Sequence, residues 1–203
     1  MGNIDLRVVK TLENIDNALL ENLKTKPLNK ITVEALCKDA RINRTTFYKH
    51  YTDKYELLDN FLSRQLEEFK ENNCIVFVDA DPENVNDDRF KLPFRETVDF
   101  LISKKDIYEV LWTAHTDRNV FNEMVEAISE SILKRFTENR PDVRDDERKF
   151  FLTSLYANLF AYNFLVSIRW WFANDYIISK RDFNKMFDDM MKVGLFRTFK
   201  EQI

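Results

Sequence analysis

Glycine and proline are scarce along this chain, and that scarcity limits its fold more than any other feature. Two glycines and four prolines occur in 203 residues, whereas folds built from many strands need such residues at their frequent turns. Hydrophobic residues make up 44% of the sequence, which is ample for a buried core. The composition therefore predicts an all-α protein.

Apolar residues recur at helical spacing in several segments near the start of the chain. Between residues 5 and 23 they fall at steps of three and four, which indicates an amphipathic helix that ends before Pro27. Thr32 and Asn43 are suited to cap two short helices, and a longer helix begins near Asp53. Two short helices joined by a tight turn form a helix-turn-helix.

Positive charge is concentrated in the same region. Residues 24–54 hold eight lysines or arginines and three acidic residues, a balance of +5, in a chain of net charge -4. Residues 61–203 hold 21 basic and 26 acidic residues, a balance of -5. Such asymmetry suits a protein that binds a polyanion at one end, although +5 over thirty residues also occurs on ordinary surfaces.

The second short helix has an inward and an outward side. Phe47 and Tyr51 are spaced i, i+4 and are expected to point into the core. The outward positions are then Arg44, Thr45, Tyr48 and Lys49. Arginine and lysine reach guanine edges or phosphates, the threonine methyl contacts thymine, and the tyrosine hydroxyl donates to phosphate. The pattern predicts a helix that reads the major groove of double-stranded DNA.

Residues 31–58, ITVEALCKDARINRTTFYKHYTDKYELL, resemble the DNA-binding region of the TetR family of bacterial transcriptional regulators. The matching positions are Thr32, Val33, Leu36, Ala40, Ile42, Thr46, Tyr48, His50, Tyr51, Lys54 and Leu57. Arg41 departs from the family by replacing the turn glycine, and Cys37 by replacing a small alanine. A left-handed Arg41 would cost about 1 kcal/mol relative to glycine.

The candidate DNA-binding residues follow from the outward positions, the caps and the resemblance. They are Thr32, Arg41, Asn43, Arg44, Thr45, Thr46, Tyr48, Lys49, His50 and Lys54. Thr32 and Lys54 are expected to bracket the DNA backbone, whereas His50 is more often a packing or capping residue at such a place. The expected domains are 1–52, which reads DNA, and 53–203, which begins with a connecting helix over 53–71.

The second region is predicted to be a helical bundle that forms a homodimer. Its last two helices are expected within residues 143–175 and 179–199, and both carry apolar stripes. One stripe comprises Phe151, Leu155, Leu159, Tyr162, Val166 and Trp170, and the other Phe183, Phe187, Met190, Met191 and Phe196. The resemblance implies that these two helices form the dimer interface. A two-fold pair would bind two half-sites of a palindromic operator.

The resemblance also implies an effector pocket among the middle helices. Candidate lining residues are Tyr108, Trp112, His115, Phe121, Met124, Tyr156 and Phe160. For any single one of them, filling the core is the better explanation, and a ligand of this lining would be apolar or aromatic. Repression is the commoner outcome in the family, and the sequence leaves activation open. An alternative is a ligand-independent regulator or adaptor whose C-terminal domain binds a protein partner.

Other functions find little support in the sequence. We expect no enzyme, cofactor or metal site, because catalytic motifs, metal-spaced His or Cys clusters and glycine-rich phosphate loops do not appear. Cys37 is expected to be a buried filler, while the role of Cys74 and of the acidic loop within 72–92 stays open. The apolar segment 157–173 contains two Asn and an Arg, so we expect a cytoplasmic protein and no membrane span.

Overall fold

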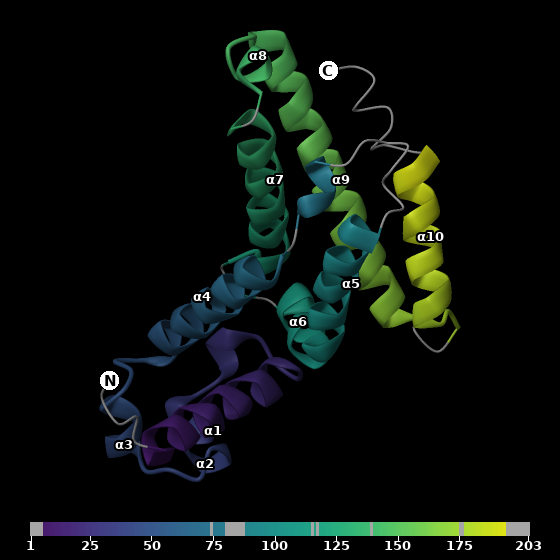
Figure 1. The fold of residues 1–203 in the computed structure, drawn as a ribbon. Helices are drawn as coiled ribbons and strands as arrows, with labels where there is room; N and C mark the ends of the chain where they lie inside the picture. The colour runs from purple at the N-terminus through teal and green to yellow at the C-terminus, as the bar shows by residue number, and fades with distance from the viewer. Residues whose placement is uncertain are drawn as a thin grey trace. The chain divides into compact units, whose positions relative to one another are not determined.

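The computed structural model describes residues 6–73, 75–79, 88–114, 116, 118–138, 140–174 and 177–193. Within these ranges the regular structure is helical and strands are absent, so the predicted all-α fold class is confirmed (Figure 1). The chain divides into two compact units, one comprising residues 1–67 and 106–120 and the other residues 68–105 and 121–203. The domain boundary expected between residues 52 and 53 stays a prediction. The compact units divide after residues 67, 105 and 120.

The first unit contains the short helices of the predicted helix-turn-helix. Its elements are α1 (Leu6–Leu23), a 3-10 turn (Leu28–Lys30), α2 (Val33–Asp39), α3 (Arg44–Tyr48), most of α4 (Lys54–Asn72) and α6 (Lys105–Thr113). Helix α1 contacts α2, and α2 contacts α3. The core is aliphatic and aromatic, and its fully buried side chains include Ile15, Leu19, Ile31, Leu36, Phe47, Leu57, Leu62 and Tyr108.

A buried polar contact joins the first two helices of this unit. The Asn22 side-chain amide donates to the Ala18 carbonyl and to the Asp39 carboxylate of α2, both at 2.8 Å. A buried amide of this kind is costly without partners, so the contact favours one register between α1 and α2.

The second unit is a helical bundle. Its elements are a 3-10 turn (Val76–Asp79), α5 (Asp88–Ser103), α7 (Val120–Glu138), α8 (Pro141–Arg144), α9 (Glu147–Ala173) and α10 (Lys180–Val193). Aromatic rings from three helices meet in its core: Phe94 of α5 lies 5.2 Å from Phe164 of α9 and 5.4 Å from Phe187 of α10, between ring centroids. Phe183 of α10 stacks on Trp171 of α9 at 4.4 Å. These contacts fix α10 against α9.

The segment 95–115, which has one helical periodicity, forms parts of two helices. Helix α5 begins at Asp88, seven residues before the periodic segment, and contains Pro93. Proline removes one backbone hydrogen bond but does not end the helix here. The break comes at Lys104, between α5 and α6, where the backbone amide donates to both Phe100 and Leu101. The apolar spacing alone does not reveal this one-residue break.

Helix α9 has two apolar faces. Its buried face includes Ala157, Ala161, Phe164, Leu165 and Ile168. On the opposite side all six residues of the predicted stripe from Phe151 to Trp170 are exposed in the single chain, each by 40% to 64%.

Among the described residues, α9 is also the helix long and apolar enough to cross a membrane, but one such helix is weak evidence because core helices share that composition.

Candidate nucleic-acid interface

The turn between α2 and α3 is a Schellman motif with arginine at its left-handed position. Arg41 has a φ of 57°, as its place in the glycine position predicted. The Ile42 amide donates to the Cys37 carbonyl at 3.0 Å, and the Arg41 amide donates to the Lys38 carbonyl at 3.2 Å. These two bonds satisfy carbonyls at the end of α2 and direct the chain into α3. Cys37 itself is buried, and burial raises the pKa of its thiol.

Both predicted caps of the short helices are present. The Thr32 hydroxyl accepts from the Ala35 amide at 3.1 Å, and the Asn43 side-chain oxygen accepts from the Thr46 amide at 2.7 Å. The Thr46 hydroxyl also donates to the Asn43 side chain, at 2.9 Å. Two members of the candidate DNA-binding set, Asn43 and Thr46, therefore also define the start of α3.

Helix α3 is oriented as the sequence predicts. Phe47 and Tyr51 are buried, with their ring centroids 5.8 Å apart. The four outward side chains are all exposed, and they are Arg44, Thr45, Tyr48 and Lys49. The Tyr48 ring packs edge-on against the Phe47 ring, with 5.5 Å between their centroids. This contact with a buried ring holds the exposed Tyr48 ring in place. The outward face of α3 therefore carries two cations, a hydroxyl, a methyl group and a phenol. The buried rings of Phe47 and Tyr51 anchor the other side.

A carboxylate from α2 contacts the outward face of α3. The Arg44 guanidinium donates to the Glu34 carboxylate at 2.9 Å, and both side chains are exposed. Sequence reasoning missed Glu34 because the two residues are ten positions apart and meet only through the fold. A single exposed pair of this kind contributes little stability, but it fixes one edge of Arg44 and places a negative charge on the candidate interface.

Lys54 has a structural contact that the sequence did not predict. Its ammonium donates to the Asn29 carbonyl at 3.2 Å and to the Ile31 carbonyl at 2.7 Å. It therefore joins the start of α4 to the segment before α2, and one of its three donors remains for a phosphate. His50 is half-buried, with its ring centroid 6.4 Å from that of Tyr51. Whether His50 packs, caps or contacts DNA stays a prediction.

The start of α4 is capped by neighbouring side chains. Asp53 accepts from the Tyr55 and Glu56 amides at 2.7 and 2.9 Å. The Glu56 carboxylate accepts from both the amide and the hydroxyl of Thr52 at 2.6 Å, and these bonds lower its pKa. The arrangement resembles a capping box, except that the Glu56 side chain bonds to Thr52, the residue before the cap.

An ion pair links α1 to α4. The Arg64 guanidinium contacts both carboxylate oxygens of Asp16, at 2.7 and 2.6 Å. Burial raises the pKa of Asp16, and Arg64 partly opposes that effect. Burial also raises the pKa of the nearby Tyr51 hydroxyl, again opposed by Arg64. Sequence reasoning missed this pair, since its members are far apart in the chain.

The candidate effector residues are divided between the two compact units. Tyr108 and Trp112 belong to the first unit, where Tyr108 is buried and stacks on Trp112 at 5.6 Å. The others that can be placed belong to the second unit: Phe121 and Met124 are buried there, and Tyr156 and Phe160 are half-buried. His115 and Cys74 lie outside the described residues, as does most of the acidic loop. The pocket stays a prediction.

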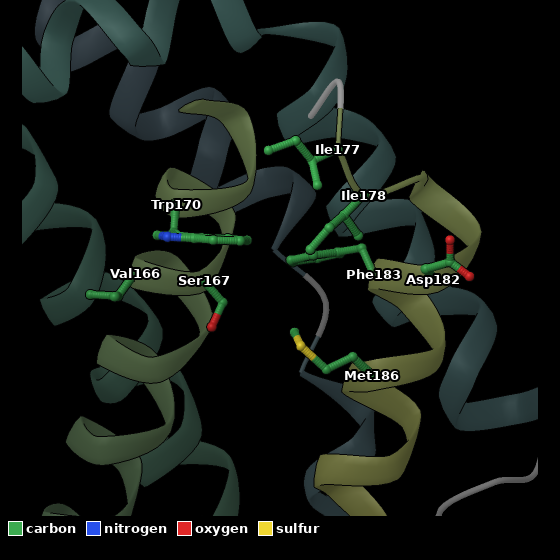
Figure 2. A pocket seen from close by; sticks show the side chains of 8 residues that line it. All are labelled: Val166, Ser167, Trp170, Ile177, Ile178, Asp182, Phe183 and Met186. Atoms are coloured by element: carbon green, nitrogen blue, oxygen red, sulfur yellow. The ribbon is translucent and has the colours of Figure 1, made fainter. Parts of the chain in front are cut away.

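An apolar groove lies between α9 and α10 in the second unit. It has a volume of about 430 Å³, and Figure 2 shows Trp170 of α9 facing Ile178 and Phe183 across it. Its lining is Val166, Ser167, Trp170, Ile177, Ile178, Asp182, Phe183 and Met186. The groove is continuous with the exposed stripe through Val166 and Trp170.

In the second predicted stripe Phe183 and Phe187 are buried, while the side chains of Met190 and Met191 and all of Phe196 lie outside the described residues.

The comparisons with known proteins find one regulator of helix-turn-helix type with a similar sequence and one solved structure with a similar fold. No protein-family model matches the chain. A Bacillus subtilis (strain 168) protein, the uncharacterized HTH-type transcriptional regulator YxbF, is 39% identical over 74 residues, which are 36% of this chain and only 20% of that protein. The solved structure of the dihydroxyacetone kinase operon activator DhaS is similar in fold, with a TM-score of 0.55 and 16% identity. That similarity covers 94% of this chain and 97% of DhaS.

Proposed function

We propose that this chain is a TetR-like transcriptional regulator that binds a palindromic operator as a homodimer in the cytoplasm and acts as a repressor. The observation that carries the proposal is the orientation of α3. Its exposed side is made of groups that suit base edges and phosphates, while Phe47 and Tyr51 anchor the other side. The sequence similarity to an HTH-type regulator and the similarity in fold to DhaS support the DNA-binding part of the proposal, whereas repression rests on the resemblance to the TetR family alone.

The surrounding residues suit a phosphate backbone. Thr32 and Lys54 lie at the starts of α2 and α4, on either side of the reading helix in sequence, and Arg41 is exposed in the turn before it. The local balance of +5 would attract DNA to this region, and the balance of -5 after residue 60 would disfavour DNA elsewhere. The remaining donor of Lys54 can reach a phosphate without disturbing its two carbonyl contacts.

The exposed stripe of α9 supports the dimer. Six large apolar side chains on one helix form a continuous patch, which is unusual for a surface that faces water. Two copies related by a two-fold axis would cover this patch with the same patch, together with the groove beside α10. A small apolar or aromatic effector would regulate DNA binding if it bound the two states of this dimer with different affinities.

Selection of binding sites from random DNA duplexes at low salt tests the DNA-binding part. We expect the chain to select a two-fold symmetric sequence, and Arg44→Ala to lose preference at the base pair that Arg44 reads. A bidentate arginine contact is worth about 1–3 kcal/mol of discrimination. Lys134→Ala on α7, which also removes one exposed positive charge, should keep the preference. A folded chain that is indifferent to every duplex would refute the proposal.

Sedimentation equilibrium tests the dimer separately. Leu155→Glu places a charge in the stripe without emptying the core, because Leu155 is exposed in the single chain. We expect the parent chain to sediment as a dimer and this variant to dissociate at micromolar concentration, whereas Lys134→Glu on α7 should remain dimeric. If Leu155→Glu stays dimeric, another surface joins the subunits.

A further inference from the structure

A group of basic side chains surrounds a second cavity, on the flank of α10 that faces α5. The cavity has a volume of about 620 Å³ and is lined by Arg95 of α5 and by Lys180, Arg181, Asn184, Lys185 and Asp188 of α10. Four cations and one carboxylate thus converge in the part of the chain whose overall balance is negative. Like charges repel one another, so a cluster of cations does not by itself stabilise the fold.

The carboxylates near the cavity neutralise only part of this charge. The Asp188 carboxylate accepts from Arg95 at 2.9 Å and lies 3.7 Å from Lys91, while Lys180 pairs with Asp99. Arg181 and Lys185 have no ion-pair partner among the residues that the structure describes. These two residues are four positions apart and therefore share one face of α10.

Two enclosed polar atoms at the same cavity lack hydrogen bonds. Arg95 Nε, a donor, and Asn184 Oδ1, an acceptor, are buried, and neither has a partner within the described part of the chain. Enclosed polar groups in folded proteins are nearly always paired, so each of these two atoms is an exception that calls for an explanation. A side-chain rotation that turned them toward the cavity would let Arg95 Nε donate to an oxyanion and Asn184 Oδ1 accept from a hydroxyl group.

The basic cavity and the apolar groove lie on different flanks of α10. The cavity uses positions 180, 181, 184, 185 and 188, whereas the groove uses 182, 183 and 186. Figure 2 shows Phe183 and Met186 directed toward α9. Subunits that pair through the stripe and the groove therefore leave the basic flank of α10 accessible.

We propose that this cavity binds a small polyanion that carries two or more phosphate or carboxylate groups. Two of the anionic groups would pair with Arg181 and Lys185, whose side chains are exposed. Such a ligand differs from the apolar or aromatic effector expected from the sequence, and its site differs from the predicted pocket. The proposal does not depend on DNA binding, because it concerns the second unit alone.

Isothermal titration calorimetry of the full chain with inorganic pyrophosphate and with citrate, at constant ionic strength and without DNA, tests the proposal. We expect saturable binding of one anion per chain for at least one of the two probes, which also tells phosphate from carboxylate. The double variant Arg181→Gln/Lys185→Gln should weaken binding about tenfold or more, since it removes two charge-assisted contacts. Lys134→Gln, a single exposed lysine on α7 of the same unit, should leave it unchanged.

Three outcomes would overturn the proposal. The first is the absence of saturable binding by either probe while the parent chain shows native helical circular dichroism. The second is equal weakening in the double variant and in Lys134→Gln, which would indicate general charge attraction. The third is displacement of the bound probe by a short random DNA duplex in the parent chain, which would assign the cavity to DNA phosphates instead.

Discussion

Replacing Arg41 with glycine is expected to stabilise the first unit. Arg41 has a φ of 57°, and a residue with a Cβ atom pays about 1–2 kcal/mol for that left-handed conformation. Glycine avoids this cost but loses about 0.5–1 kcal/mol through the greater freedom of the unfolded chain. The net gain in the free energy of unfolding is about 0.5–1 kcal/mol.

Two further substitutions at the same position separate the backbone from the charge. Arg41→Ala removes the exposed guanidinium but keeps the Cβ atom, so its stability should stay within about 0.5 kcal/mol of the parent. Arg41→Asn should fall between alanine and glycine, because asparagine tolerates the left-handed region better than most residues. All three variants lose the same positive charge and should weaken DNA binding to a similar extent.

Amide hydrogen exchange is the appropriate assay, because it reports the first unit separately. The Ile42 amide closes the turn by donating to Cys37, and its exchange should slow about two- to fivefold in Arg41→Gly, as expected for the calculated gain. The melting temperature of the unit should rise by about 2–8 °C. A glycine variant less stable than the alanine variant would show that the left-handed conformation of Arg41 does not limit stability.

Three other residues give testable predictions. Lys54→Met should lower the free energy of unfolding, measured in urea, by about 1–2 kcal/mol, because two backbone carbonyls lose a charged donor. The control Lys49→Met, at an exposed position, should change this free energy by less than about 0.5 kcal/mol. Glu34→Gln should strengthen binding to all DNA duplexes in a salt titration, since it removes a negative charge beside Arg44; unchanged affinity would place Glu34 away from the phosphates. Hydrogen bonds from Arg140 and Lys149 lower the pKa of Asp142 to about 2. The stabilisation from Asp142 is therefore present above its unfolded pKa near 4 and is lost as the pH falls toward 2, so carboxyl NMR should show this low pKa and Asp142→Asn should flatten acid unfolding in that range.

The sequence was most informative where structure depends on neighbouring residues. The caps Thr32, Asn43 and Asp53 are local, because each side chain bonds to amides two or three positions ahead. The burial of Phe47 and Tyr51 follows from helical spacing in the same way.

Contacts between distant segments were not predictable from spacing. Arg44 meets Glu34 only because the Schellman turn brings α3 back against α2, and Arg64 meets Asp16 across 48 positions. The basic cavity was also missed, since Arg95 and the α10 residues are more than eighty positions apart. No periodic pattern connects such residues, and only the packed helices bring them together.

The outward apolar side of α9 has a consequence for inheritance. It belongs to a different compact unit from α3, so a substitution that disables α3 leaves this side unchanged. If two subunits pair through it as proposed, defective and intact polypeptides made in one cell would form mixed pairs with a single working half. An α3 mutation would then be dominant over the normal allele, and Leu155→Glu in the same polypeptide would make it recessive.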